Sequence, residues 1–339
     1  MILNPGGGIV ARQRTRWLAA LLGATALVGA CGQTDSSGDG AQTSDADRPT
    51  VVVTTNILGD VVGELVGATA EVVTIMPIGA DPHDFQASAQ EVNQIQSADV
   101  LIVNGADFEE TLLDVIESAE ADGIPTFEAI AAVEKLEFTE QGHDEDHADE
   151  EDHADDEHDH EGADPHFFTD VARMAQAADA IGEFLLANLD GVDTAALQAN
   201  IDAYVTELTA LDTEVAAILD AVPSDRRVLI TNHEVFGYFA ERYGFDVVGA
   251  VIPSGSTADG ASAQDLAALA EEIEHEGVAA IFADTSSSNE LAQTLAAEVG
   301  GDVHVVELFS ESLGEPGSGG STYVEMMRTN AERIVEALG

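Results

Sequence analysis

Residues 194–223 read TAALQANIDAYVTELTALDTEVAAILDAVP, and this stretch decides the fold. Its apolar side chains recur at steps of three and four residues, which is the period of one buried helical face. Pro223 ends the pattern, because proline lacks a backbone N–H and cannot continue a helix. At 1.5 Å of rise per residue, a helix over Thr194–Ala221 would be about 40 Å long. Such a helix can connect two lobes.

On both sides of this helix, strands and helices alternate. The β-branched strand Val51–Thr55 is followed by a helical pattern over Ile57–Val66, and the strand Arg227–Thr231 opens the same alternation again. The other predicted helices include Glu109–Ala119, Phe168–Leu189, Glu234–Tyr243 and Tyr323–Leu338. Strict alternation indicates a doubly wound α/β architecture. We therefore predict an α/β fold of two doubly wound lobes, 51–192 and 223–339, joined by one long rigid helix over 193–222.

The N-terminus has the pattern of a bacterial lipoprotein signal. Three arginines precede a short apolar segment, Trp17–Val28, and small residues lead to Cys31, the sole cysteine. We predict a signal peptide over 1–30, a lipid on Cys31 and a flexible tether over 31–50. With a single cysteine the chain can form no intramolecular disulfide. The protein is then expected outside the cytoplasm, anchored to the outer face of the cell membrane.

The formal net charge of -54 excludes nucleic acid as a partner, because DNA and RNA are themselves polyanions. The acidic residues are spread over the chain and not confined to one run. Such a surface keeps a protein hydrated in a salty exterior, but it is also compatible with the composition of the lineage alone.

Residues 143–161, HDEDHADEEDHADDEHDHE, form an acidic run rich in histidine. With no apolar side chain larger than alanine, the run has nothing to bury and is predicted to be a solvated loop. Imidazoles among carboxylates bind zinc, copper or nickel weakly, whereas a purely acidic run would be solvated surface. We predict a low-affinity metal loop whose histidines are His143, His147, His153, His158 and His160.

Two Asp-Pro-His tripeptides indicate a pair of metal ligands. They are Asp81-Pro82-His83 and Asp164-Pro165-His166. Proline fixes its own φ and extends the aspartate before it, so each histidine is held on a stiff turn. A single copy would also suit a helix start. His83 in addition follows a predicted strand, at the edge where α/β sheets bind ligands.

The second lobe supplies His233 and two carboxylates at the corresponding edge. His233 follows the strand Arg227–Thr231, Asp284 ends a strand, and Glu311 follows another. Taken alone, His233 would also suit a polar helix start. Three imidazoles and one carboxylate fill the tetrahedral shell of zinc and leave no position for a catalytic water, so binding is the predicted function. The two remaining histidines, predicted to be surface or packing residues, are His275 and His304.

Taken together, these motifs resemble the metal-binding solute-binding proteins of bacterial ABC importers, cluster A-I, and within them the zinc-uptake branch. The resemblance covers nearly the whole mature chain. It includes both Asp-Pro-His copies, the histidine-rich run, the linking helix, the segment Asn232–Phe239, Phe309-Ser310-Glu311-Ser312, Tyr323 and Met326-Met327.

This resemblance implies a metal site in the cleft between the lobes, with Zn²⁺ as the transported ligand. By position, the ligands are His83 and His166 from the first lobe and His233 and Glu311 from the second. The family often has aspartate where Glu311 stands, so Asp284 and a water are alternative fourth ligands. Manganese-selective relatives have a carboxylate at the position of His233, so a nitrogen there favours zinc.

The resemblance also implies capture of zinc and its delivery to an ABC transporter permease. A monomer is expected, and a zinc metallochaperone is a further candidate partner. Two other functions are considered: a metal-binding adhesin or zinc buffer of the same fold, and a zinc-dependent hydrolase. The chain has no His-Glu-x-x-His motif, which disfavours the hydrolase.

Overall fold

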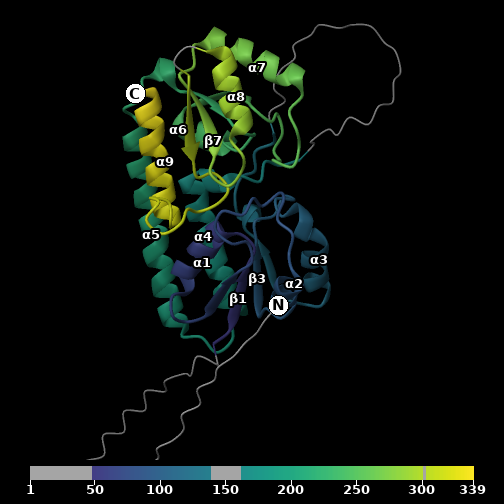
Figure 1. Ribbon diagram of the computed structural model, residues 1–339. Coiled ribbons are helices and arrows are strands. Elements are labelled where there is room, and N and C mark those ends of the chain that lie inside the picture. The colour runs from purple at the N-terminus through teal and green to yellow at the C-terminus, as the bar shows by residue number, and fades with distance from the viewer. Residues whose placement is uncertain (1–47, 139–161, 301–302) are drawn as a thin grey trace, which may run out of the picture. The chain divides into compact units, whose positions relative to one another are not determined.

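The computed structural model describes residues 48–138, 162–300 and 303–339. These residues form two α/β lobes, each built on a four-stranded parallel sheet, with the long helix α5 (Thr194–Leu219) running along both (Figure 1). The predicted signal peptide, Cys31 and the histidine-rich run lie outside the described residues. No helix in the described ranges combines the length and hydropathy needed to cross a bilayer.

The first lobe has the strand order β2-β1-β3-β4, with every neighbouring pair parallel. Apart from the half-buried Thr50, its central strands consist of buried valine, leucine and isoleucine, as expected of strands covered on both faces. Its strands are β1 (Thr50–Val53), β2 (Glu71–Thr74), β3 (Val100–Val103) and β4 (Thr126–Glu128). Its helices are α1 (Asn56–Val66), α2 (Ala89–Gln96), η2 (Glu110–Leu112), α3 (Leu113–Ala121), η3 (Ala129–Ala132), η4 (Phe167–Thr169) and α4 (Val171–Asn188).

The second lobe repeats this topology with the order β6-β5-β7-β8, again all parallel. In both lobes the order reverses beside the first strand, and ligands of such sheets bind at the carboxyl ends near that point. Its strands are β5 (Val228–Thr231), β6 (Asp246–Ala250), β7 (Ala280–Asp284) and β8 (His304–Leu308). Its helices are η5 (Ser224–Arg226), α6 (Gly237–Tyr243), α7 (Ala263–Glu276), α8 (Glu290–Val299) and α9 (Tyr323–Leu338).

Helix α5 joins the two lobes through one shared core. Asp193 caps its first turn by accepting hydrogen bonds from the backbone N–H groups of Ala195 and Ala196. The helix packs against α1 and α4 of the first lobe and α9 of the second. Gly182 of α4 permits close approach, because a Cβ there would overlap the side chain of Ile201. The buried face consists of Leu197, Ile201, Tyr204, Leu208, Leu211, Val215 and Leu219.

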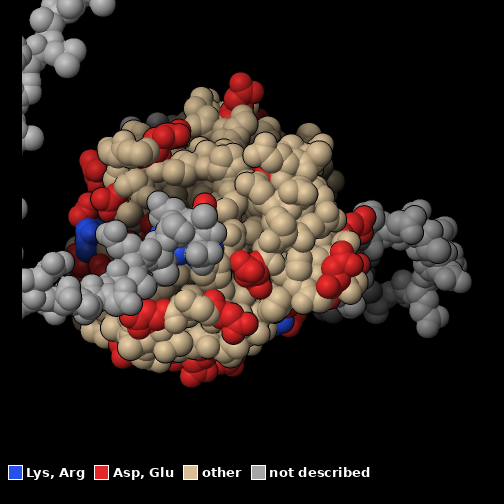
Figure 2. Space-filling view, turned by 90° about the horizontal axis from the view of Figure 1, so that it is seen from below, with Lys and Arg blue, Asp and Glu red and all other residues tan. Residues whose placement is uncertain are grey.

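The surface is acidic, as the composition predicts. Figure 2 shows Asp and Glu side chains scattered over one face with few Lys or Arg among them.

One predicted helix begins at the wrong residue, and two others are divided in the structure. Helix α6 starts at Gly237 instead of Glu234, because the segment after β5 turns away: the N–H of Glu234 donates to Ser254 O and that of Val235 to His233 O. The helix expected over Phe168–Leu189 is divided into η4 and α4, and the one expected over Glu109–Ala119 into η2 and α3. In each case the helical pattern of the sequence extends, at its N-terminal end, into a turn that is not α-helical and that lies beside or carries a residue of the site.

Candidate metal centre

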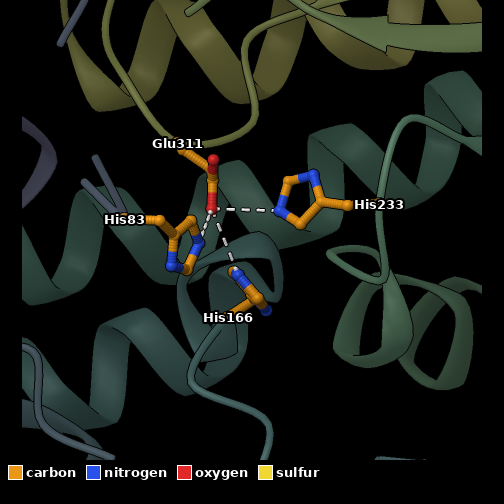
Figure 3. Close-up of side chains that lie close together, drawn as sticks. All are labelled: His83, His166, His233 and Glu311. Carbon is orange, nitrogen blue, oxygen red and sulfur yellow. Dashed lines mark hydrogen bonds and ion pairs between the residues drawn. The ribbon is translucent and has the colours of Figure 1, made fainter. Parts of the chain in front are cut away.

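Four side chains from the two lobes converge on one point. The ligand atoms of His83, His166, His233 and Glu311 all lie within 4.8 Å of one another, and all four residues are buried. Oε1 of Glu311 is 2.7 Å from Nε2 of His83, 3.3 Å from Nε2 of His166 and 3.0 Å from Nε2 of His233 (Figure 3). The three imidazoles thus direct the same ring nitrogen to the same place.

The two Asp-Pro-His copies form the same turn. Asp81 accepts a hydrogen bond from the backbone N–H of His83 at 3.0 Å, and Asp164 accepts one from that of His166 at 2.9 Å. This local bond fixes where each histidine backbone lies, as expected for an aspartate at the start of a turn. The first copy lies between β2 and α2, and the second precedes η4.

His233 and Glu311 lie after strands of the second sheet. His233 follows β5, and its carbonyl accepts a hydrogen bond from the side chain of Thr231 at 2.7 Å. Glu311 lies in the loop 309–322 that connects β8 to α9. Both positions are at carboxyl ends of the second sheet, and His83 follows the carboxyl end of β2 in the first sheet, so both sheets present their carboxyl edges to the site.

The outer ring nitrogens of two histidines bond to carboxylates. Nδ1 of His166 is 2.7 Å from Oδ1 of the buried Asp164, and Nδ1 of His83 is 2.9 Å from Oε1 of Glu110, which is 38% exposed. Such a bond places the ring proton on Nδ1 and leaves Nε2 free to bind a metal ion. Nδ1 of His233 has no hydrogen-bond partner among the described residues.

The charges at the site shift the pKa values of its members. Burial alone would lower the pKa of His83, but the charge of Glu311 and hydrogen bonds to Glu110 and Glu311 raise it to about 10. Burial likewise opposes the charged form of His166, yet the bond to Asp164 raises its pKa. For Glu311, burial is outweighed by His233 and His83, which hold its pKa well below the usual range. Glu311 is therefore ionised and carries the site's negative charge.

The donor set fits a borderline divalent cation. Three imidazole nitrogens and one carboxylate oxygen are ligands that zinc accepts in tetrahedral geometry. The second oxygen of Glu311, Oε2, is buried and accepts no hydrogen bond from any described residue, so it too is available to an ion. The ring of Phe108 contacts the edges of His83 and His166, with centroids 5.3 and 5.5 Å apart, and gives the site an apolar wall.

Asp284, the alternative fourth ligand, is buried nearby but lies outside the converging group. Its carboxylate accepts hydrogen bonds from Ser286 and Ser310. Burial and the nearby charge of Glu311 raise the pKa of Asp284. Its position makes Asp284 a support for Ser310, the neighbour of Glu311.

The remaining histidines of the described residues lie away from the site. The side chain of His275 is 77% exposed on α7, beside Glu272 and Glu276. His304 is exposed at the start of β8, the end opposite to the site. Both are surface residues, one of the two roles expected. The five histidines of the 143–161 run lie outside the described residues.

Glu110 was not predicted from the sequence. It lies in η2, where an acidic residue reads as an ordinary helix start, and no motif marks it. It lines an interlobe cleft of about 350 Å³ together with His83, Phe138 and Ser256. This cleft borders the converging side chains on the side of His83.

Comparison with known proteins identifies the class. Residues 51–337 match the family model described as the periplasmic component A of the zinc-uptake complex. The chain is 31% identical to the zinc-binding protein TroA of Treponema pallidum, over 96% of this chain and 99% of TroA. It is 26% identical to the manganese-binding lipoprotein MntA of Halalkalibacterium halodurans, over 92% of this chain and 95% of MntA. It is 25% identical to the iron ABC transporter substrate-binding lipoprotein MtsA of Streptococcus pyogenes, over 95% and 97% of the two chains.

The fold agrees with this relationship. The solved structure of TroA superposes with a TM-score of 0.75 at 29% identity, over 86% of this chain and 99% of TroA. The named relatives bind different metals, so the comparison establishes a metal-binding protein without establishing which metal. The chain belongs to the family of the periplasmic zinc-uptake component A, whose members are metal-binding, solute-binding components of ABC importers and not enzymes.

Proposed function

We propose that the protein captures Zn²⁺ outside the cytoplasm, binds it with His83, His166, His233 and Glu311, and delivers it to an ABC transporter permease. The observation that carries the proposal is the convergence of three Nε2 atoms on the single carboxylate of Glu311. With these four ligands the zinc shell is full, so the ion is held as cargo and does not activate water.

The donor types support zinc over manganese. Imidazole suits zinc and copper, whereas manganese prefers carboxylate and water oxygens. With His233 as a third nitrogen ligand, the site has a single carboxylate, that of Glu311. Asp284 is bonded to serines and does not add a second.

Several features outside the described residues complete the proposal. Cys31 carries a lipid that holds the mature protein at the outer face of the membrane, and relatives bear the name lipoprotein. The histidine-rich run 143–161 collects zinc at low affinity. The protein acts as a monomer, and a zinc metallochaperone is a candidate partner of the run.

A metal competition titration tests the assignment. The purified mature protein is freed of metal and titrated with Zn²⁺ or Mn²⁺ against a chromophoric chelator. We expect one tight zinc site, with manganese bound more weakly by at least about a hundredfold, as the ligand preferences imply. Equal affinity, or tighter binding of manganese, would overturn the zinc assignment.

A growth experiment separates the importer from an adhesin or zinc buffer. A deletion strain should grow normally in zinc-replete medium and fail when a chelator makes zinc scarce. Complementation with the wild-type gene should restore growth, and a His166→Ala gene should not. Normal growth of the deletion strain under chelation, with zinc uptake unchanged, would favour the buffer or adhesin.

A further inference from the structure

Asn56, the first residue of α1, uses its whole side-chain amide to connect the two lobes. Its Nδ2 donates to the carbonyl of Pro77 at 3.1 Å and to Oγ of Ser312 at 3.1 Å, while its Oδ1 accepts from the N–H of Leu313 at 2.7 Å. Asn56 is buried. Pro77 belongs to the first lobe, whereas Ser312 and Leu313 belong to the second.

The hydroxyl of Ser312 completes the connection. Its Oγ accepts the backbone N–H of Gly79 at 2.7 Å and lies 3.0 Å from the carbonyl of Leu313, to which it can donate. Ser312 is also fully buried. The hydrogen bonds of Asn56 and Ser312 thus form one buried network that spans the interface between the lobes.

Both loops of this network carry a residue of the metal centre. The segment that includes Pro77 and Gly79 leads to His83, and Ser312 directly follows Glu311. The network therefore fixes the backbone beside Glu311 relative to the backbone that leads to His83.

We propose that Asn56 is a positioning residue for zinc binding: it locks the loop of Glu311 onto the first lobe, so that the second lobe's carboxylate is held against His83. The proposal rests on the proposed function, since it takes Glu311 to be a ligand. Asn56 touches no ligand atom and acts only through the loop. Side chains that hydrogen-bond a metal ligand directly contribute about 10- to 100-fold in metal affinity, and Asn56, which acts one step further from the ion, is expected at the lower end of this range.

The test combines two substitutions in a double-mutant cycle. Asn56→Ala should weaken zinc binding about tenfold in chelator competition. In a Glu311→Ala background the same substitution should change the affinity by less than about twofold, because residues that act through one another are not additive. A full loss in both backgrounds would show that Asn56 acts on the lobes in general, and would overturn the proposal.

Hydrogen exchange provides a readout that needs no metal. In chelator, Asn56→Ala should speed exchange of the Leu313 and Gly79 amides, which donate into the network, while amides inside β8 keep the wild-type rate. Ser312→Ala removes the partner from the other lobe and should have the same effect on Gly79. Wild-type exchange at both amides in Asn56→Ala would show that the network does not hold the loop.

Thr257→Val is the matched control, because Thr257 makes a separate bond between the lobes by donating to Asp81 at 2.6 Å. It should weaken zinc binding less than Asn56→Ala does, and an equal loss would contradict a specific role for Asn56. Thermal unfolding in chelator confirms that each variant folds. If Glu311→Ala weakens zinc binding and Asn56→Ala does not, this inference alone fails. If neither weakens it, the assignment of Glu311 as a ligand fails as well.

Discussion

Zinc affinity should rise with pH through the neutral range, because the ion and a proton compete for Nε2 of His83. That nitrogen lies 2.7 Å from Oε1 of the ionised Glu311, and without metal it is the donor of this bond. The charge of Glu311 and the bonds to Glu110 and Glu311 overcome burial and raise the pKa of His83 to about 10. At neutral pH the histidine is therefore protonated, and zinc must displace the proton.

The size of the effect follows from the distance between the solution pH and this pKa. At about pH 7 the pKa of His83 lies about three units above the solution pH, so removing its proton costs about 4 kcal/mol. Proton competition therefore lowers the apparent zinc affinity about a thousandfold. His83 keeps its proton at every pH below its raised pKa. The loss of zinc affinity that this proton causes shrinks about tenfold for each unit of pH increase and vanishes only above about pH 10. The pKa of His166 is also raised, so this imidazole binds a second competing proton as the pH falls and the slope steepens.

Calorimetry in buffers of different ionisation enthalpy measures the protons released when zinc binds. We expect at least about one proton per ion at about pH 7.5, and competition titrations from about pH 7 to about pH 9 should show affinity rising about tenfold per unit. His304→Gln, which replaces an exposed imidazole away from the site, should leave both results unchanged. Zero proton release with a flat affinity over this range would refute the protonated His83.

Three other outcomes are expected. His233→Asp should narrow the zinc-to-manganese affinity ratio by at least about tenfold in competition titration, because an oxygen ligand replaces a nitrogen; an unchanged ratio would place His233 outside the shell. Glu110→Gln should speed zinc release about tenfold in stopped-flow chelation, because the amide orients the imidazole of His83 less firmly. Asp107→Asn, at the same cleft, serves as its control. Deletion of 143–160 should lower the number of zinc ions in equilibrium dialysis while one tight site stays; loss of that site would make the run part of it.

The fold class was predictable because the strands carry an unambiguous signal. Buried β-branched runs such as Val51–Val53 alternate with amphipathic helices, and packing in the folded protein does not override that pattern. The three histidines were also predictable, since a strand end or a stiff Asp-Pro turn places each of them locally. The structure brings His83, His166 and His233 together, as that reading expected.

The sequence favoured Glu311 over Asp284 only through the family resemblance. Both follow or end a strand of the same sheet; in the structure Glu311 meets the three histidines, whereas Asp284 accepts hydrogen bonds from serines. Asn56 and Glu110 could not be recognised from the sequence for a related reason. Each of them looks like an ordinary residue at a helix start, and Asn56 lies 256 residues from its partner Ser312 in sequence. Periodicity describes neighbours along the chain, and these partners are neighbours only in space.

Helix α5 has a mechanical consequence. One unbroken helix of 26 residues, packed on both sides of the cleft, has no pivot about which the lobes could swing apart. We expect fluorescent labels on α2 and α7 to report almost the same separation with and without zinc. Exchange of the ion then depends on small displacements of the loops 75–88 and 309–322, so a permease needs to disturb only a few bonds at the rim to receive its cargo.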